Sequence, residues 1–511
     1  MSVHIVFIVL VAAAAFLYIL YCLRRPNSLS LPPGPPRDPL IGHLRYIPST
    51  NRAAAFHEWA KIYGDIMYLD VLGNPMIVLN TEKIAVDLLN KRSSIYSDRP
   101  RFILYEMIGW STTLSLMPYG KRFAAHRQLH RSYLNRTKCR EFRPVQTLEA
   151  RTLVKNLLDA PPATYSDFIN RQEATIVAGH RISSDDDPYM RTTQALRESL
   201  GRSGVPGCTS LDFLPFLRYL PAWFPGFPFG TIARECRPPL QRLYDFPLQT
   251  VQGQMASQHE SGVARPSFLL TQLERIRENP EPRNYDDIKW AAAAMFGSTI
   301  WSSVTVFILA MLLHPEYQVK AQKEIDSVVG QSRLPDFEDR QNLPLVECIV
   351  QETLRWHPPT ELGVPHRLME DDLYHGMFIP KGIHRLCEHP YSAMSLDESI
   401  YSSPKHFFPE RFLPKPTGSG EPHFASAYGF GRRVCSGQHL ADQSLWIAIA
   451  SILAACTISN AYDERGNAIV PEAEDVMSDG VSSHPNDFPC VISCRDAHIR
   501  AVVLESVLDE D

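Results

Sequence analysis

The stretch FASAYGFGRRVCSGQHLA, from Phe424 to Ala441, places a single cysteine between a glycine-rich turn and the start of an apolar helix. That cysteine is Cys435. Gly429, Gly431 and Gly437 carry no Cβ, so the backbone around it is able to bend tightly and to approach a flat partner closely. The backbone amides that follow Cys435 point back toward its sulfur, which suits a metal-bound thiolate.

The charges around Cys435 predict a thiolate rather than a thiol. The positive end of the following helix and the adjacent cations Arg432 and Arg433 favour a negative sulfur. Either arginine also suits an anionic group of a bound ligand. A structural zinc or iron-sulfur site is poorly supported, because such sites need several ligands and no CxxC lies nearby. The alternative is a buried structural cysteine, the usual role of a lone cysteine.

This loop resembles the heme-binding signature of the cytochrome P450 family, FxxGxRxCxG. Four positions match it: Gly431, Arg433, Cys435 and Gly437. Tyr428 stands where the family usually has its first Phe. The resemblance implies that the chain binds heme b (iron protoporphyrin IX), with Cys435 as the axial iron ligand and Arg433 at a heme propionate. Phe430 and Gly437 are expected to contact the cofactor as well.

By length alone the chain would form either two or three domains or one large enzyme with a single core. The chain has 511 residues, of which 44% are hydrophobic and 21% charged, so it is able to bury a sizeable core. The formal net charge of −5 argues against nucleic acid as a partner. The 10 cysteines show no framework spacing, which fits a reducing compartment better than a disulfide-stapled secreted protein.

An unbroken apolar run from Ile5 to Leu23 predicts an N-terminal transmembrane helix. As a helix it would be roughly 28 Å long, close to the hydrocarbon thickness of a bilayer. Arg24 and Arg25 follow at once and would stay on the cytosolic side. A cleaved signal peptide is the alternative, but the run is long for one and no basic segment precedes it. We expect a single-pass protein of the endoplasmic reticulum with a cytosolic catalytic domain.

The expected division of the chain is a membrane anchor at 1–25, a proline-rich hinge at 26–40 and a heme-thiolate catalytic domain at 41–511. The hinge contains LPPGPP at Leu31–Pro36, where the prolines stiffen the chain and prevent a helix. Leu211–Phe229 is rich in aromatic residues and proline and has no clean helical period. It is either a packed loop or a second surface that dips into the membrane and guards substrate entry.

The expected fold class is mainly α with small β-sheets (α+β). Alternating apolar residues in Ile66–Leu79, around a Gly-Asn-Pro turn, predict a hairpin. Long helical patterns dominate elsewhere, notably in Thr81–Lys91, Asp286–Leu313, Pro315–Val329 and Pro344–Trp356. The resemblance implies the cytochrome P450 fold over about Pro32 to Val503, preceded by the transmembrane helix.

Glu352 and Arg355, in the segment ETLRWHPP, lie three residues apart on a predicted helix and share a face. Such a pair is a weak signal alone, because exposed pairs at this spacing are common. The sequence FFPERF at Phe407–Phe412 adds Arg411 shortly before the Cys loop. This order resembles the family's buried Glu-Arg-Arg network, which braces the heme face.

The apolar segment at 291–313 resembles the family's long helix on the distal side of the heme, where [AG]Gx[DE]T[TS] is usual. Thr299 matches the alcohol that helps deliver protons during oxygen activation. Ser298 replaces an acid, and Phe296 replaces a glycine that leaves room. A serine relays a proton through water but has no pKa near neutrality from which to donate one. The alternative for Thr299 is a helical threonine that bonds its own backbone.

Two further segments resemble parts of the family that touch the heme. FAAHR at Phe123–Arg127 resembles the WxxxR helix, with Phe in place of Trp and with Arg127 as the cation expected at a propionate. LGVPHR at Leu362–Arg367 resembles the segment that crosses beside the heme. There His366 is expected to contact a propionate, unless it is a surface histidine or one satisfied elsewhere.

The substrate pocket is expected to form above the heme, with Phe296 narrowing it over the iron. Its expected lining, besides Thr299, is Met107, Trp110, Phe296, Val364, Ser483 and His484. The LGVPHR segment and the Ser-His-Pro sequence that begins at Ser483 resemble fungal members of the family that oxidise secondary metabolites.

One segment departs from the family pattern. After Ile379-Pro380-Lys381-Gly382, relatives continue with an apolar strand, whereas Ile383–Pro390 reads IHRLCEHP and carries charges. Local divergence, an imperfect gene sequence or a degraded enzyme would each explain the difference.

The resemblance implies a membrane-anchored heme-thiolate monooxygenase that takes electrons from an NADPH-cytochrome P450 reductase. It would insert one oxygen atom into an apolar small molecule, a terpenoid or polyketide of fungal secondary metabolism. Two alternatives stay open. Ser298 and Phe296 also suit a heme-thiolate isomerase that needs no reductase, and Ile383–Pro390 suits a heme-binding protein that has lost catalysis.

Overall fold

The computed structural model describes residues 30–48, 51–159, 166–182, 187–221, 223–224, 228–261, 266–278, 285–295, 300–383, 385–388, 391–472, 477–478 and 482–508. The expected transmembrane helix at Ile5–Leu23 and the first residues of the hinge lie outside these ranges.

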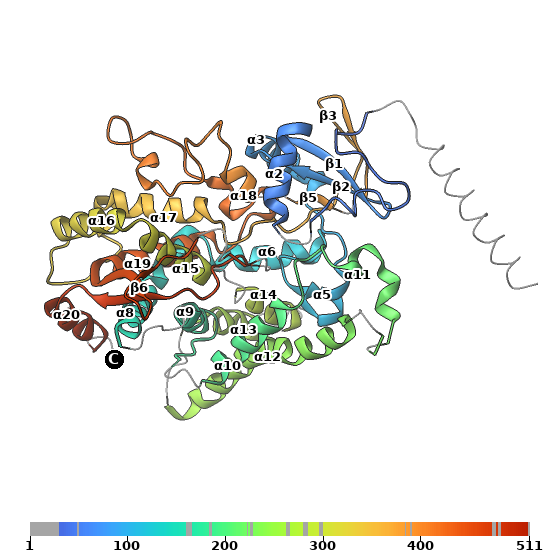
Figure 1. Ribbon diagram of the computed structural model, residues 1–511. Coiled ribbons are helices and arrows are strands. Elements are labelled where there is room, and N and C mark those ends of the chain that lie inside the picture. The colour runs from blue at the N-terminus through green and yellow to red at the C-terminus, as the bar shows by residue number, and fades with distance from the viewer. Residues whose placement is uncertain are drawn as a thin grey trace, which may run out of the picture.

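The described chain folds into a helix-rich body with three small sheets, so the expected mainly helical α+β class is confirmed (Figure 1). The sheet of β1, β2 and β5 lies at one end with α2 and α3, and α20 lies at the other. The α-helices are α2 (Arg52–Tyr63), α3 (Glu82–Ala85), α4 (Ser93–Tyr96), α5 (Ile103–Ile108), α6 (Lys121–Tyr133), α7 (Arg136–Cys139), α8 (Arg143–Asp159), α9 (Ser166–Ala178), α10 (Pro188–Gly201), α11 (Ser210–Phe213), α12 (Phe229–Ser261), α13 (Phe268–Glu278), α14 (Tyr285–Met295), α15 (Ile300–Leu313), α16 (Pro315–Val328), α17 (Pro344–Trp356), α18 (Tyr391–Ser395), α19 (Gln438–Ala455) and α20 (Ala497–Leu508).

Short turns of tighter or wider helix connect these elements. One is a π-helix, η1 (Val86–Lys91), which continues α3 through the segment expected to be helical at Thr81–Lys91. The others are the 3-10 turns η2 (Trp110–Thr112), η3 (Arg140–Phe142), η4 (Pro215–Tyr219), η5 (Asp339–Asn342), η6 (Pro409–Phe412), η7 (Ala425–Tyr428) and η8 (Gly431–Arg433). The 3-10 turns η6, η7 and η8 carry the chain from the Arg411 segment into the Cys loop.

The expected hairpin is confirmed as β1 (Ile66–Val71) paired antiparallel with β2 (Asn74–Leu79). Leu72 and Gly73 both have positive φ, so the turn needs the left-handed backbone that Gly73 adopts without cost. The third strand of this sheet, β5 (Arg385–Glu388), pairs parallel with β2. The charged segment Ile383–Pro390 therefore still contributes a strand, because ladder hydrogen bonds come from the backbone and do not require apolar alternation.

The other two sheets are small and antiparallel. β3 (Asp372–Tyr374) pairs with β4 (Met377–Ile379). β6 (Cys456–Tyr462) lies between β7 (Ala468–Ile469) and β8 (Cys490–Cys494), and it follows α19 directly.

Two apolar helices form the centre of the largest hydrophobic core. Every residue of α15 from Ser302 to Leu312 is buried, as is every residue of α19 from Gln443 to Ala455. A helix that is apolar all round belongs in the core of a large protein or in a membrane. Within the described residues, Tyr285–Leu313 is long and apolar enough to span a membrane, but 86% of its most apolar window is buried inside the protein. The surroundings are those of a core helix.

The described part of Leu211–Phe229 combines a buried base with an exposed aromatic surface. Leu211 and Leu217 are buried, whereas Phe216, Tyr219 and Trp223 are 62%, 76% and 78% exposed. Such a concentration of exposed large apolar side chains favours an interaction surface over a packed loop.

Glu352, Arg355 and Arg411 meet in a fully buried ionic cluster. The Glu352 carboxylate accepts two hydrogen bonds from Arg355, both at 2.7 Å, and contacts the Arg411 Nε at 3.1 Å. All three side chains are 0% exposed. Glu352 also accepts the Phe408 N–H at 2.8 Å, and Arg411 donates to Glu421 at 2.7 Å. The cluster ties α17 to η6 and to the chain that leads into the Cys loop.

We expect Glu352→Gln to lower the free energy of unfolding by about 3 to 5 kcal/mol, because it leaves two buried guanidinium groups without their shared carboxylate. Chemical denaturation of the solubilised protein, followed by circular dichroism, measures the change. Lys61→Ala is the matched control, since its ion pair with Glu58 is exposed and the denaturation midpoint should not move. Equal shifts for both variants would contradict the assignment of the Glu352 cluster as a structural brace.

Candidate active site around Cys435

Cys435 lies between η8 and α19, whose N-terminal cap is Gly437. The Cys435 N–H donates to the Tyr428 carbonyl oxygen at 2.7 Å, which closes the loop on itself. The Gly437 N–H donates to the Cys435 sulfur. Backbone groups at the positive end of a helix therefore hold the sulfur. Within the described residues, no group of three or more His, Cys, Asp or Glu side chains gathers as a metal site.

Gly431 fixes the Cys loop against η1. Its φ is +53°, and a Cβ there would overlap the Leu89 carbonyl oxygen. Its N–H donates to the Asn90 side chain. A Cβ at Gly437, by contrast, would lie 3.9 Å from the Cys435 sulfur, which is ordinary contact. The close approach that the sequence predicted for a flat partner is, at Gly431, an approach to the protein's own backbone.

The surroundings of the Cys435 thiol affect its ionisation. Its side chain is accessible to solvent, yet the surrounding protein desolvates it enough to raise the pKa of the thiol. The Gly437 N–H and Arg127 lower that pKa, but burial is the larger effect. Burial therefore opposes the helix end and the cations, which favour the thiolate. A thiolate here needs a positive partner at the sulfur, which a heme iron supplies.

An excess of positive charge surrounds Arg433. Burial lowers the pKa of Arg433 to about 8, and repulsion from Arg99 and Arg127 adds to the effect. The neighbouring carboxylate Asp98 opposes this shift, but Arg367 and the backbone already engage it. A buried group of cations with too little negative charge is suited to an anionic ligand, so these residues fit the propionates of heme.

The Arg433 guanidinium is held in place by three backbone carbonyl oxygens. It donates to Ser97 at 2.7 Å, Leu114 at 3.1 Å and Met117 at 2.8 Å. It also lies 3.9 Å from the centre of the Phe123 ring. Since a guanidinium has five N–H donors, two remain for a further acceptor. Phe123 keeps the aromatic face that the usual Trp would offer to the cation.

Arg127 is half-buried on α6 and makes no hydrogen bond or ion pair with any residue that the structure describes. Burial lowers its pKa, while the nearby Cys435 acts in the opposite direction. The buried Arg99 was not predicted from the sequence. It donates to the carbonyl oxygens of Val364 and Pro365 at 2.5 and 2.9 Å, so it links the LGVPHR segment to the same cations.

His366 and Phe430 both have protein partners. The His366 Nδ1 donates to the Tyr96 carbonyl oxygen at 2.7 Å, and the side chain is buried. This contact favours the satisfied-histidine alternative. Phe430 is buried in a hydrophobic cluster, with its ring stacked on Tyr391 at 6.2 Å between centres.

Ser483 and His484 are brought against α15. The Ser302 hydroxyl donates to the Ser483 carbonyl oxygen, and the His484 and Trp301 rings lie 4.4 Å apart. The Ser483 hydroxyl donates to Glu361 at 2.9 Å. Trp301, Ser302 and Glu361 were not predicted, because no spacing in the sequence connects them to Ser483.

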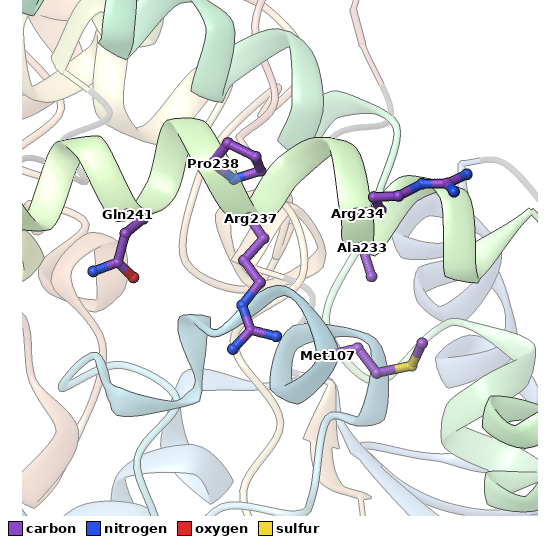
Figure 2. Close-up of a pocket in the computed structure, with 6 residues that line it drawn as sticks. All are labelled: Met107, Ala233, Arg234, Arg237, Pro238 and Gln241. Carbon is purple, nitrogen blue, oxygen red and sulfur yellow. The ribbon is translucent and has the colours of Figure 1, made fainter.

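The remaining expected pocket residues lie apart from this group. Val364 and Trp110 are half-buried and pack, together with Met107, against a hydrophobic cluster that contains Tyr105, Leu240 and Phe268. Met107, on α5, also lines an open groove of about 660 Å³ against α12. Figure 2 shows Arg237 reaching from α12 across this groove toward α5. Among the expected pocket residues that the structure describes, the others do not line it. Phe296, Ser298 and Thr299 lie outside the described residues.

Comparison with known proteins gives one consistent result. The cytochrome P450 family model matches residues 32–474. Cytochrome P450 monooxygenase 176 of Postia placenta is 35% identical, covering 98% of this chain and 97% of its own. Cytochrome P450 monooxygenase claR of Ampulloclitocybe clavipes is 38% identical, covering 95% and 90%. Cytochrome P450 monooxygenase ARMGADRAFT_974139 of Armillaria gallica is 35% identical, covering 97% and 98%.

The family model matches most of the chain. The structure agrees with this match, because it places a lone cysteine at a helix N-terminus and a group of cations nearby. The relatives are fungal monooxygenases of nearly the same length. The chain belongs to the cytochrome P450 family, whose members are monooxygenases that bind heme b, take electrons from a redox partner and act on small molecules.

Proposed function

We propose that Cys435 is the axial ligand of the heme iron in this monooxygenase. The observation that carries the assignment is the Gly437 N–H donating to the Cys435 sulfur at the start of α19. Burial raises the pKa of the free thiol, so the thiolate would depend on coordination to iron for its stability.

The proposed heme contacts follow from the charges around the loop. Arg433 and Arg127 would bind the propionates, since both are partly buried cations and lack a sufficient counter-charge. Gly437, Phe430 and His366 are proposed as further cofactor contacts, with Phe430 and His366 acting from fixed positions in the surrounding protein. Glu352, Arg355 and Arg411 would brace this face of the site.

Bound heme would supply the oxygen activation that inserts one oxygen atom into an apolar substrate. Thr299 is the proposed alcohol that moves a proton into the site. Ser298 would pass a proton through water, because a hydroxyl has no pKa near neutrality from which to donate. The proposed pocket lining consists of Met107, Trp110, Phe296, Val364, Ser483 and His484.

We infer a terpenoid or polyketide substrate of fungal secondary metabolism. The apolar and aromatic character of the proposed lining supports this class. The similarity to fungal monooxygenases also supports it. Comparison of the metabolites of a producing strain with and without the gene tests the inference, and loss of an oxidised terpenoid or polyketide is the expected result.

The proposed setting is the endoplasmic reticulum membrane, with electrons from an NADPH-cytochrome P450 reductase. A membrane anchor at 1–25 and a proline-rich hinge at 26–40 would precede the catalytic domain at 41–511. The exposed aromatic residues Phe216, Tyr219 and Trp223 support a second membrane contact.

A heme-thiolate isomerase is the alternative function that the sequence still supports. A heme-thiolate isomerase would need neither reductase nor an acid at position 298, and Ser298 and Phe296 both suit it. The heme-binding protein without catalysis loses its main support, since Ile383–Pro390 still provides β5.

Cys435→Ala should abolish the thiolate-type absorbance of the ferrous carbon monoxide complex, because no other residue of the loop offers sulfur to iron. Absorbance spectroscopy of the purified variant, compared with its total heme content, measures the effect. Cys456→Ala is a matched control, as this buried cysteine lies at the start of β6. Persistence of the thiolate-type band in Cys435→Ala would contradict the ligand assignment.

Deletion of residues 1–25 should release most of the protein from membranes while heme incorporation persists, because the deleted segment precedes the catalytic domain. Fractionation by ultracentrifugation measures the membrane-bound share. Equal retention would instead assign the attachment to the aromatic surface of Leu211–Phe229, and the further variant Trp223→Ser should then release the protein.

Ser298→Asp should raise the fraction of NADPH consumption that is coupled to product, provided that heme content is unchanged. Thr299→Ala should act in the opposite direction and divert reduced oxygen toward peroxide. Product, peroxide and NADPH measured together with purified reductase give the coupling. If Thr299→Ala leaves coupling unchanged and the enzyme converts substrate without NADPH or reductase, the isomerase alternative is correct.

A further inference from the structure

His130 connects the Cys loop to α14 from a buried position on α6. Its side chain is 1% exposed. Its Nδ1 lies 2.8 Å from the Ser436 hydroxyl oxygen, and its Nε2 lies 2.9 Å from the Ala291 carbonyl oxygen. Ser436 directly follows Cys435, so one imidazole ring joins the proposed ligand loop to the helix that precedes residues 296–299.

The two contacts determine which ring nitrogen carries the proton. A carbonyl oxygen only accepts, so the Nε2–H must donate to Ala291. In the neutral ring, Nδ1 is then an acceptor, and the Ser436 hydroxyl must donate to it. Burial lowers the pKa of His130 to about 4, so the ring is neutral at physiological pH and this arrangement persists.

Ser436 lies between Cys435, which carries the sulfur, and Gly437. The peptide that joins Ser436 to Gly437 carries the N–H that donates to the Cys435 sulfur. The bond to a buried ring restrains the Ser436 side chain, and Ser436 is joined directly to the peptide that carries the Gly437 N–H.

We propose that His130 is a positioning residue that, through Ser436, keeps the Gly437 N–H on the Cys435 sulfur and so preserves the thiolate on the heme iron. This inference rests on the proposed role of Cys435 as ligand. His130 itself touches neither the sulfur nor the cofactor in this scheme. Its effect is on the retention of thiolate coordination, which is measurable apart from turnover.

His126 provides a control one helical turn earlier on the same face of α6. It is fully buried, and its Nε2 lies 3.0 Å from the Asp287 carboxylate on α14. His126 and His130 are four residues apart, as are their partners Asp287 and Ala291, so both histidines fasten α6 to α14. Of these two, only His130 reaches the Cys loop.

Four single variants of the full-length holoenzyme separate the two bonds of His130. His130→Asn keeps an acceptor near the position of Nδ1, and His130→Gln keeps a donor near the position of Nε2. Ser436→Ala removes the hydroxyl but leaves the Ala291 contact. His126→Gln disturbs the α6–α14 contact alone. For each, the ferrous carbon monoxide complex is followed by absorbance, and thermal unfolding is followed by circular dichroism.

We expect His130→Gln and Ser436→Ala to lose thiolate-type absorbance roughly tenfold faster than the unaltered enzyme, as fits the loss of one buried hydrogen bond with an orphaned partner. His130→Asn should restore much of the retention. His126→Gln should lower the unfolding temperature without changing the rate of spectral loss.

Equal spectral loss in His126→Gln and His130→Gln would overturn the proposal, because it would reduce both histidines to general packing. Unchanged retention in Ser436→Ala would also overturn it. Failure of the ligand assignment is a different result, since Cys435→Ala would then keep the thiolate-type band that these variants are designed to weaken.

Discussion

The buried carboxylate of Glu352 is the constraint on which the placement of the Cys loop depends. Removal of a charge from water costs several kcal/mol, so Glu352, Arg355 and Arg411 are stable in the interior only when all three are paired. Arg411 extends the cluster to Glu421, which lies three residues before Phe424, the start of the loop. The need to pair the buried Glu352 on α17 thus fixes the position of Arg411 and of the chain that leads into the Cys loop.

A second group of cations differs from this cluster in its balance of charge. Around Glu352 the arginines donate to a shared carboxylate and to backbone carbonyl oxygens at close range. Arg433 donates to backbone carbonyl oxygens and has other cations nearby. Burial and repulsion from those cations lower the pKa of its guanidinium. A buried cluster whose charges are paired stabilises the fold. A buried cluster with excess positive charge is suited to bind an anion. The contrast separates a brace from a binding site without reference to motif.

The sequence predicts those features that local patterns encode. The hairpin, α16, α17 and the approach of Arg411 to Glu352 follow from periodicity, turn residues and the family resemblance. The His130–Ser436 contact does not, because its partners lie 306 residues apart, Ser436 occupies a variable position of the signature and His130 lies outside the motifs. The sequence shows the helix dipole and the arginines that favour a thiolate at Cys435, but it does not show the desolvation that raises the pKa of the free thiol.

Tyr428 and Phe123 differ from the residues that the family usually has at these positions. Both are compatible with the site, because the contacts there use a backbone carbonyl oxygen and a ring face. At Tyr428 the contact to Cys435 is made by a backbone carbonyl oxygen, which a change of Phe to Tyr does not alter. At Phe123 the ring face still lies against Arg433, although the indole N–H of a Trp is lost. Backbone geometry and ring faces tolerate substitution better than a charge does. Tyr428 in the loop and Phe123 on α6 differ from the family pattern at aromatic positions, whereas Arg433, Cys435 and Gly431, which packs on Leu89, match it.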